Sequence, residues 1–164
     1  MERDVVVSNT TPLIALAWVE QLDLLPTLFG VVYIPQAVHR ELHRNPDKIG
    51  SAELIAASWL KVKTVKNVLA VEMLADELDA GESEAIVLAH EMKAGLLLMD
   101  ERRGRRRAAA GGLAVVGTLG ILIEARQRGL VGPLQPLLDR LRELPFRMSE
   151  TLYGDVLRQV GERL

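Results

Sequence analysis

Two polar residues in this chain follow short apolar runs, in places where a parallel α/β sheet would collect a ligand. Asn9 comes directly after the run 5–8, and Asp100 comes directly after the run 96–99. Ligands of open α/β sheets bind beyond the carboxyl ends of the strands, where the strand order reverses. If these two runs are neighbouring strands, Asn9 and Asp100 face one cleft. Each residue could instead cap or begin a helix.

Two glutamates lie beside apolar helix faces, where a charge is costly. Glu82 lies on the apolar stripe of a helix expected over 82–93, one turn before Ala85 and Ile86. Glu41 lies beside the apolar face of a helix that begins at Pro35. A buried carboxylate needs a cation, a hydrogen-bond network or solvent. Each glutamate alone could equally reach solvent from the margin of its stripe. The two together with Asp100 favour a shared site.

The chemistry of this acidic set favours a hard cation. The chain has no cysteine, which excludes disulfide scaffolds, thiolate metal sites and cysteine nucleophiles. His39 and His43 have the spacing of a zinc-binding helix, but Arg40 stands where the zinc peptidase motif requires glutamate. Carboxylate and amide oxygens are ligands that suit Mg²⁺ or Mn²⁺. We therefore expect Mg²⁺ or Mn²⁺ as the cofactor.

Positive charge is concentrated immediately after Asp100. Five arginines stand within six residues: Arg102, Arg103, Arg105, Arg106 and Arg107. The whole chain has 20 basic and 22 acidic residues and a net charge of −2, so its average charge alone argues against a basic nucleic-acid-binding surface. The cluster could be a solvated helix face. Its place beside the acidic set instead favours phosphate binding by Arg102 and Arg103.

The pattern of apolar runs predicts an α/β protein. Short apolar runs alternate with helical segments, which is typical of a parallel sheet covered by helices on both faces. The expected strands are 5–8, 31–34, 62–65, 96–99 and 113–116. The length of 164 residues suits a single domain over 1–164, with the last two helices, about 134–163, as a C-terminal extension. The charged start and the lack of an apolar run of ~18 residues predict a cytoplasmic protein without a membrane partner.

Several of these segments resemble the PIN-domain family, the nuclease fold of VapC-type toxins, and in particular a prokaryotic PIN-like subfamily. The similar segments are 5–14, 41–42, 81–86, 97–101, 117–120 and 146–149. The resemblance implies a Rossmann-like parallel sheet of four or five strands flanked by helices on both faces. It also implies an acidic cluster that holds Mg²⁺ or Mn²⁺, and an activity that hydrolyses the phosphodiester bonds of RNA.

By the same resemblance, Glu41, Glu82 and Asp100 occupy acidic positions of the metal site, and Asn9 occupies the position of the first acid. We expect Asn9, Glu41, Glu82 and Asp100 to be catalytic, with Asn9, Glu82 and Asp100 as the metal ligands. The expected substrate contacts are Thr10, Arg102, Arg103 and Thr118.

Asn9 departs from the family pattern, because most PIN nucleases have aspartate there. Asparagine offers a carbonyl oxygen but no charge, which weakens both metal binding and water activation. Two functions therefore stay open: a metal-dependent endoribonuclease, possibly the toxin of a toxin–antitoxin pair, or a PIN-like module that has lost its chemistry and binds RNA or a protein. The expected partners are RNA, a small antitoxin protein and a second copy of the chain.

Overall fold

The computed structural model describes residues 4–145 and 148–163. Within them, five parallel strands form one sheet in the order β3-β2-β1-β4-β5. The strands are β1 (Val6–Ser8), β2 (Val32–Pro35), β3 (Leu60–Lys63), β4 (Leu96–Leu98) and β5 (Val115–Val116). The first three residues, with part of the charged start, and Phe146 and Arg147 of the segment 146–149 lie outside the described residues.

The strand order reverses between β1 and β4. From β1 the chain adds β2 and β3 on one side, and it then returns to add β4 and β5 on the other side. Ser8 pairs with Leu98 in parallel register, and the amide of Asn9 donates a hydrogen bond to the carbonyl of Leu98 at 2.9 Å. The two strands are thus neighbours, which was the condition for Asn9 and Asp100 to face one cleft, and Asn9 stands at the switch point.

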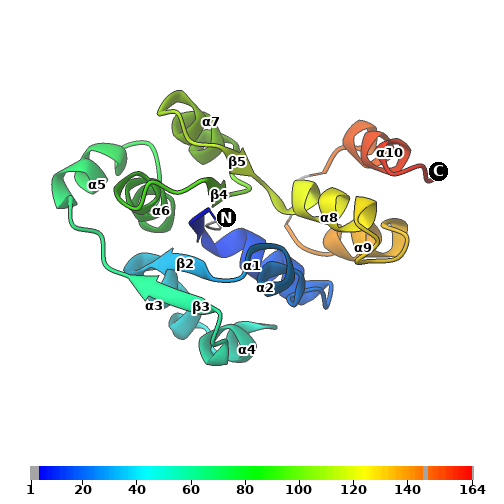
Figure 1. Ribbon diagram of the computed structural model, residues 1–164, viewed down its shortest axis with the longest axis horizontal. Coiled ribbons are helices and arrows are strands. Elements are labelled where there is room, and N and C mark those ends of the chain that lie inside the picture. Colours follow the sequence, from blue (N-terminus) through cyan, green and yellow to red (C-terminus); the bar gives the residue numbers. More distant parts are fainter. Residues whose placement is uncertain (1–3, 146–147, 164) are drawn as a thin grey trace.

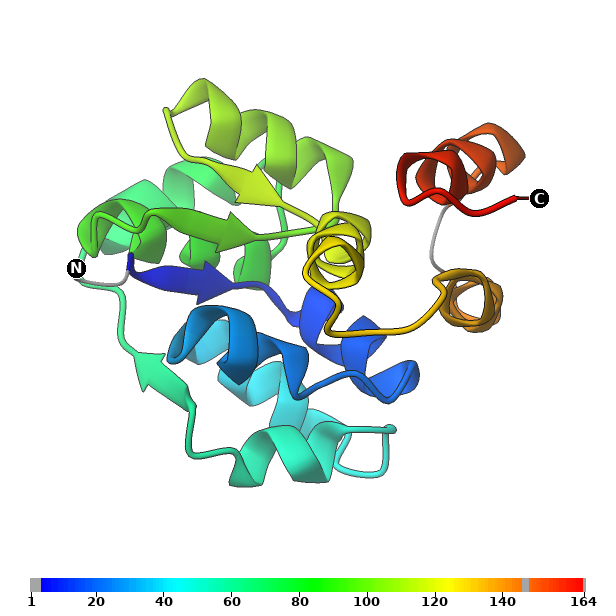
Figure 2. The ribbon, with the colours of Figure 1, turned by 45° about the vertical axis from the view of Figure 1, so that its right-hand side comes forward.

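Ten helices within the described residues surround the sheet (Figures 1 and 2). They are α1 (Thr10–Trp18), α2 (Leu24–Phe29), α3 (Gln36–Arg44), α4 (Ser51–Ala56), α5 (Val68–Leu74), α6 (Ala80–Glu91), α7 (Arg102–Ala110), α8 (Thr118–Gln127), α9 (Gln135–Leu141) and α10 (Glu150–Gln159). Helices α5, α6 and α7 pack on one face of the sheet, and α1, α2, α8, α9 and α10 belong to the other side. Helix α3 contacts both α1 and α6. None of the described helices is long and apolar enough to cross a membrane.

Alternation along the strands divides the core between the two faces of the sheet. Val6 and Leu98 pack into the cluster that contains α1, α8, α9 and α10. Val7, Leu97 and Met99 pack into the cluster formed with α5, α6 and α7. The central strands are therefore buried on both sides, which explains why they read as continuous apolar runs in the sequence.

Around the edge strand, one sequence expectation had the wrong bounds and one helix was not predicted. The strand expected over 62–65 is β3, which begins at Leu60, and helix α5 was not predicted at all. The side chains of Val68, Leu69 and Met73 in α5 are exposed, so the helix has no sharply defined core-facing stripe. A local signal was nevertheless present, because Asn67 caps α5 by accepting a hydrogen bond from Ala70 N at 3.0 Å.

Candidate metal and phosphate site

A cavity of about 870 Å³ lies beyond the carboxyl end of β4. It combines acidic residues around the start of α6, arginines of α7 and apolar side chains of α8 and the C-terminal region. The lining residues are Thr11, Glu77, Asp79, Glu82, Asp100, Glu101, Arg102, Arg103, Arg105, Leu119, Pro145 and Leu152. Two of the predicted acids, Glu82 and Asp100, therefore share one cavity with the two arginines that were predicted to bind phosphate.

Asn9 occupies the N-cap position of α1 but does not cap that helix. Its side chain makes no capping hydrogen bond and is only 4% exposed. Its Oδ1 atom instead faces the start of α6, where it would lie 3.1 Å from a Cβ atom added to Gly81. Helix capping, the structural alternative for Asn9, therefore does not account for this side chain.

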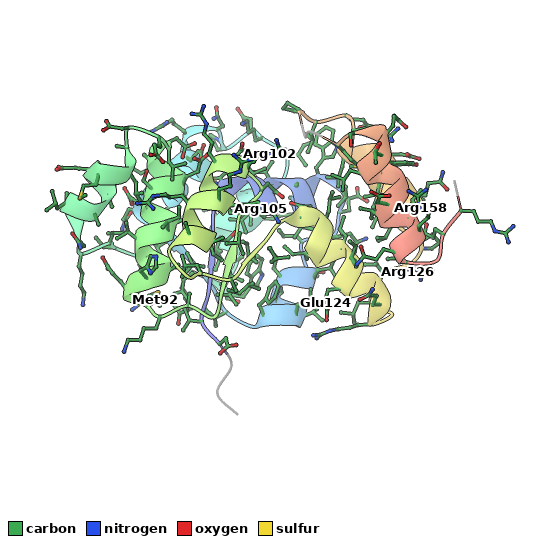
Figure 3. All side chains as sticks on the ribbon, turned by 90° about the horizontal axis from the view of Figure 1, so that it is seen from above. Met92, Arg102, Arg105, Glu124, Arg126 and Arg158 are labelled. Atoms are coloured by element: carbon green, nitrogen blue, oxygen red, sulfur yellow. The ribbon has the colours of Figure 1, made fainter. Side chains whose placement is uncertain are left out.

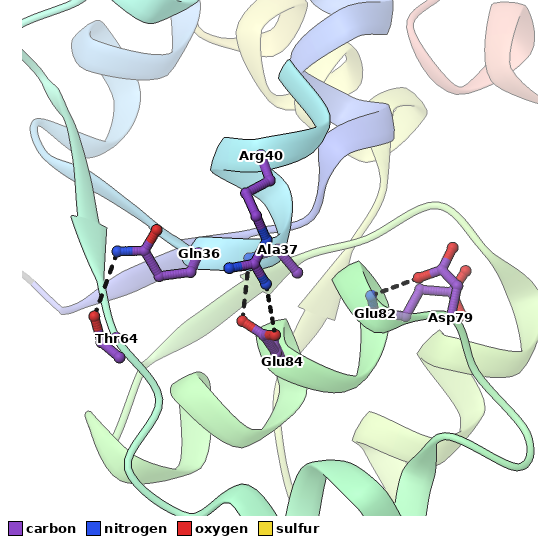
Figure 4. A network of polar contacts seen from close by, with 7 residues as sticks. All are labelled: Gln36, Ala37, Arg40, Thr64, Asp79, Glu82 and Glu84. Atoms are coloured by element: carbon purple, nitrogen blue, oxygen red, sulfur yellow. Dashed lines mark hydrogen bonds and ion pairs between the residues drawn. The ribbon is translucent and has the colours of Figure 1, made fainter. Parts of the chain in front are cut away.

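Glu82 lies in the first turn of α6 and lines the cavity. The helix begins there because Asp79, the N-cap residue, accepts a hydrogen bond from Glu82 N at 2.8 Å (Figure 4). Glu82 is 8% exposed, and this burial, together with repulsion from Asp79 and Glu101, raises the pKa of its carboxyl from 4.5 to about 7. A carboxylate in such surroundings gains from a nearby cation.

Asp100 is held by the N-terminus of α8. Its Oδ1 accepts a hydrogen bond from Thr118 N and its Oδ2 accepts one from Thr118 Oγ1, both at 2.7 Å. Burial raises the pKa of Asp100, while these two hydrogen bonds and the nearby Arg105 act in the opposite direction. Thr118 was predicted to contact substrate, but its side chain is fully buried and positions Asp100 in this conformation.

Glu41 reaches the site from α3, which is fixed to α6. The carboxylate of Glu84 accepts a hydrogen bond from Ala37 N at 3.1 Å and pairs with Arg40 at 3.6 Å (Figure 4). Glu84 thus has a structural role in which it joins the two helices. The side chain of Thr10, predicted to bind substrate, donates a hydrogen bond to Glu41 Oε2.

Oxygen atoms from three segments face the position that a Cβ atom of Gly81 would occupy. A Cβ atom at this glycine would lie 3.1 Å from Asn9 Oδ1, 3.6 Å from Glu41 Oε2 and 3.6 Å from Asp79 Oδ1. We call this space the Gly81 cradle. Its donors are all oxygens, one from an amide and two from carboxylates, so their chemistry fits Mg²⁺ or Mn²⁺.

The observed arrangement differs from the predicted metal set of Asn9, Glu82 and Asp100. Among the residues that the structure describes, no three side chains of His, Cys, Asp or Glu form a group that could hold a metal ion. Glu82 and Asp100 line the cavity, whereas Asn9 faces the cradle together with Glu41 and Asp79. Asp79 was missed by the sequence analysis, although its spacing from Glu82 is that of a capping box, which brings both carboxyl groups to one helix end.

The arginine cluster is divided between the cavity and other surfaces. Arg102, Arg103 and Arg105 line the cavity, and Figure 3 shows Arg102 and Arg105 on α7, well apart from Arg126 and Arg158. Arg105 was not predicted to contact substrate. Its place follows from the absence of a side chain at Gly117, where an added Cβ would lie 2.7 Å from both Arg105 Nη1 and Asp100 Oδ1.

Comparison with known proteins agrees with this architecture. A family model described as a PIN domain matches residues 5–162, nearly the whole chain. A search of curated proteins finds no match. PIN domains are nuclease folds, and the parallel sheet flanked by helices is the architecture that the sequence resemblance implied. The chain therefore belongs to the PIN-domain family.

Proposed function

We propose that this protein is a metal-dependent endoribonuclease that hydrolyses phosphodiester bonds of RNA in the cavity at the β1/β4 switch point. The observation that carries the proposal is the meeting of two carboxylates, Glu82 and Asp100, with three arginines of α7 in one cavity. Metal-dependent hydrolysis of RNA uses an anionic site for the cation and a cationic surface for the phosphate backbone. The membership of the chain in a family of nuclease folds supports this reading.

The acidic residues would provide the metal site. Asn9, Glu41, Glu82 and Asp100 are the proposed catalytic residues, and all offer oxygen ligands that suit Mg²⁺ or Mn²⁺. When bound, such a cation lowers the pKa of a coordinated water and stabilises negative charge in the transition state. The Thr118 hydrogen bonds would keep Asp100 oriented toward the cavity.

The chain's own groups would bind the RNA and handle the proton. Arg102, Arg103 and Arg105 line the cavity and would hold phosphates on either side of the scissile bond. In the metal-free protein the pKa of Glu82 is about 7, so its carboxylate is suited to accept a proton from water near neutral pH. Thr10 is a further candidate for substrate contact, through the hydroxyl that meets Glu41.

Asn9 favours one alternative of a different class. A neutral amide at this position lowers the charge of the site, so the protein would instead be a PIN-like module that binds RNA or a protein partner without cleaving. A toxin role with a small antitoxin, a homodimer and a cytoplasmic location also stay predictions.

Cleavage of a labelled pool of random single-stranded RNA, in Mn²⁺ and then in Mg²⁺, tests the proposal. We expect the wild type to cleave, and Glu82→Gln and Asp100→Asn each to lower the rate by at least about 100-fold, because each removes an acid from the site. Glu124→Gln, which removes an exposed carboxylate of α8, is the matched control and should cleave as the wild type does.

Two outcomes would contradict the nuclease proposal. They are a wild type that leaves the RNA intact in both metals, and acid variants that cleave at the wild-type rate. Asn9→Asp separates the alternatives, because a weakened nuclease should gain activity through the added charge. A binding module should remain inactive after this substitution and keep its affinity for RNA.

A further inference from the structure

We infer that Asp79 supplies the anionic ligand that Asn9 cannot, so that a divalent cation binds in the Gly81 cradle between Asp79, Asn9 and Glu41. This inference rests on the proposed function and places the cation in the cradle, next to the cavity that Glu82 and Asp100 line. It also accounts for a PIN domain with asparagine at position 9, because the missing charge would come from a different segment of the chain.

The geometry carries the inference. Asn9 follows β1, Glu41 lies in α3 and Asp79 precedes α6, yet Asn9 Oδ1, Glu41 Oε2 and Asp79 Oδ1 all lie 3.1–3.6 Å from the position that a Cβ atom of Gly81 would occupy. Gly81 has no side chain to fill this point. Oxygen donors from several segments that face one another are what a hard cation requires from a protein, with waters completing its coordination.

Helix capping alone does not require a carboxylate at position 79. As the N-cap of α6, Asp79 accepts from Glu82 N at 2.8 Å through Oδ1, the same oxygen that faces the cradle and that has a second lone pair for a cation. Asparagine or serine would cap a helix about as well. Asp79 lines the cavity together with Glu77, Glu82 and Glu101, so its charge adds to repulsion among acids. A bound cation would remove that repulsion.

Mn²⁺ binding measured by isothermal titration calorimetry tests the role of Asp79 without reference to cleavage. Asp79→Asn keeps a good N-cap, so its thermal unfolding without metal should match the wild type, while its dissociation constant for Mn²⁺ should rise at least about tenfold. Asp76→Asn is the matched control, because it makes the same chemical change at an exposed position that does not line the cavity. It should bind Mn²⁺ as the wild type does.

Moving the charge gives a sharper comparison. In the double variant Asn9→Asp with Asp79→Asn, the cradle regains one aspartate in place of the other, and Mn²⁺ affinity should return to within a few-fold of wild type. Gly81→Ala places a methyl group in the cradle, 3.1 Å from Asn9 Oδ1. It should weaken Mn²⁺ binding even though alanine favours the helix more than glycine does.

The inference is overturned if Asp79→Asn binds Mn²⁺ as tightly as the wild type, if Asp76→Asn weakens binding equally, or if the wild type binds no Mn²⁺. A failure of the proposed function would look different. Wild-type protein that binds Mn²⁺ through Asp79 but leaves RNA intact would contradict the nuclease proposal and support the inference. RNA cleavage that persists in Asp79→Asn, with Mn²⁺ affinity unchanged, would contradict the inference alone.

Discussion

At the scale of single residues, several carboxylates of the site region also fix helix ends. Asp79 caps α6, Glu84 accepts from the first turn of α3, and Asp100 accepts two hydrogen bonds from Thr118 at the start of α8. Negative charge is favoured at a helix N-terminus, so these contacts stabilise the fold while they hold the acids in place. Glu82 is the acid that burial affects most clearly, with a pKa near 7.

The raised pKa of Glu82 predicts that the metal-free protein loses stability as the pH rises. The folded state keeps the proton of Glu82 up to about pH 7, whereas the unfolded chain releases it near 4.5, so the free energy of unfolding falls as pH increases across this window. We expect a loss of about 1–3 kcal/mol from this group. Thermal unfolding in EDTA from pH 5 to 8 measures it.

Glu82→Gln is the comparison for this pH dependence. The variant has no proton to lose at position 82, so its melting temperature should fall less between pH 5 and 8 than that of the wild type. Part of the slope should remain, because burial also raises the pKa of Asp100 and acts with the same sign. Equal slopes in the two proteins would show that Glu82 is not the group responsible.

At the scale of elements, the ends of α8 and α10 complete the cavity. Leu119 of α8 and Leu152 of α10 form part of its apolar lining. The C-terminal helix is anchored because Tyr153 Oη donates to Asp139 at 2.7 Å and Glu162 accepts from Leu134 N at 2.7 Å. Residues far beyond the acidic motifs therefore help to shape the site.

At the start of α8, a side chain at position 117 would collide with two residues of the site. In Gly117→Ala the new Cβ would meet Asp100 and Arg105 at 2.7 Å, so both side chains must shift. We expect a loss of about 1–3 kcal/mol in urea unfolding, together with slower RNA cleavage. Gly132→Ala is the control, since a Cβ there meets nothing within 4 Å. Equal effects of the two substitutions would contradict the role assigned to Gly117.

At the scale of the whole molecule, the sheet was predictable because its central strands are buried on both faces and form continuous apolar runs. The sequence placed Asn9 and Asp100 at strand ends, but it did not specify that β1 and β4 are neighbours, which the strand order of the folded sheet decides. The role of Thr118 and the approach of Asp79 to Asn9 were not predictable. They depend on how the first turns of α8 and α6 dock against the sheet, which no local pattern specifies.

The distribution of charge follows from the same architecture. A net charge of −2 concealed an acidic cavity with arginines in its wall, because folding brings Asp79, Glu82 and Asp100 beside α7. Composition reports only the average of these opposed groups. The meeting of these opposed charges in one cavity supports the proposal that RNA is the substrate.

The most direct test of the central claim, that this cavity and its cradle bind a divalent cation, is anomalous diffraction from a crystal grown in Mn²⁺. The account predicts an anomalous peak within coordination distance of Asp79 and Asn9, next to the cavity that contains Glu82 and Asp100. Density without any peak in this region at millimolar Mn²⁺ would contradict the claim.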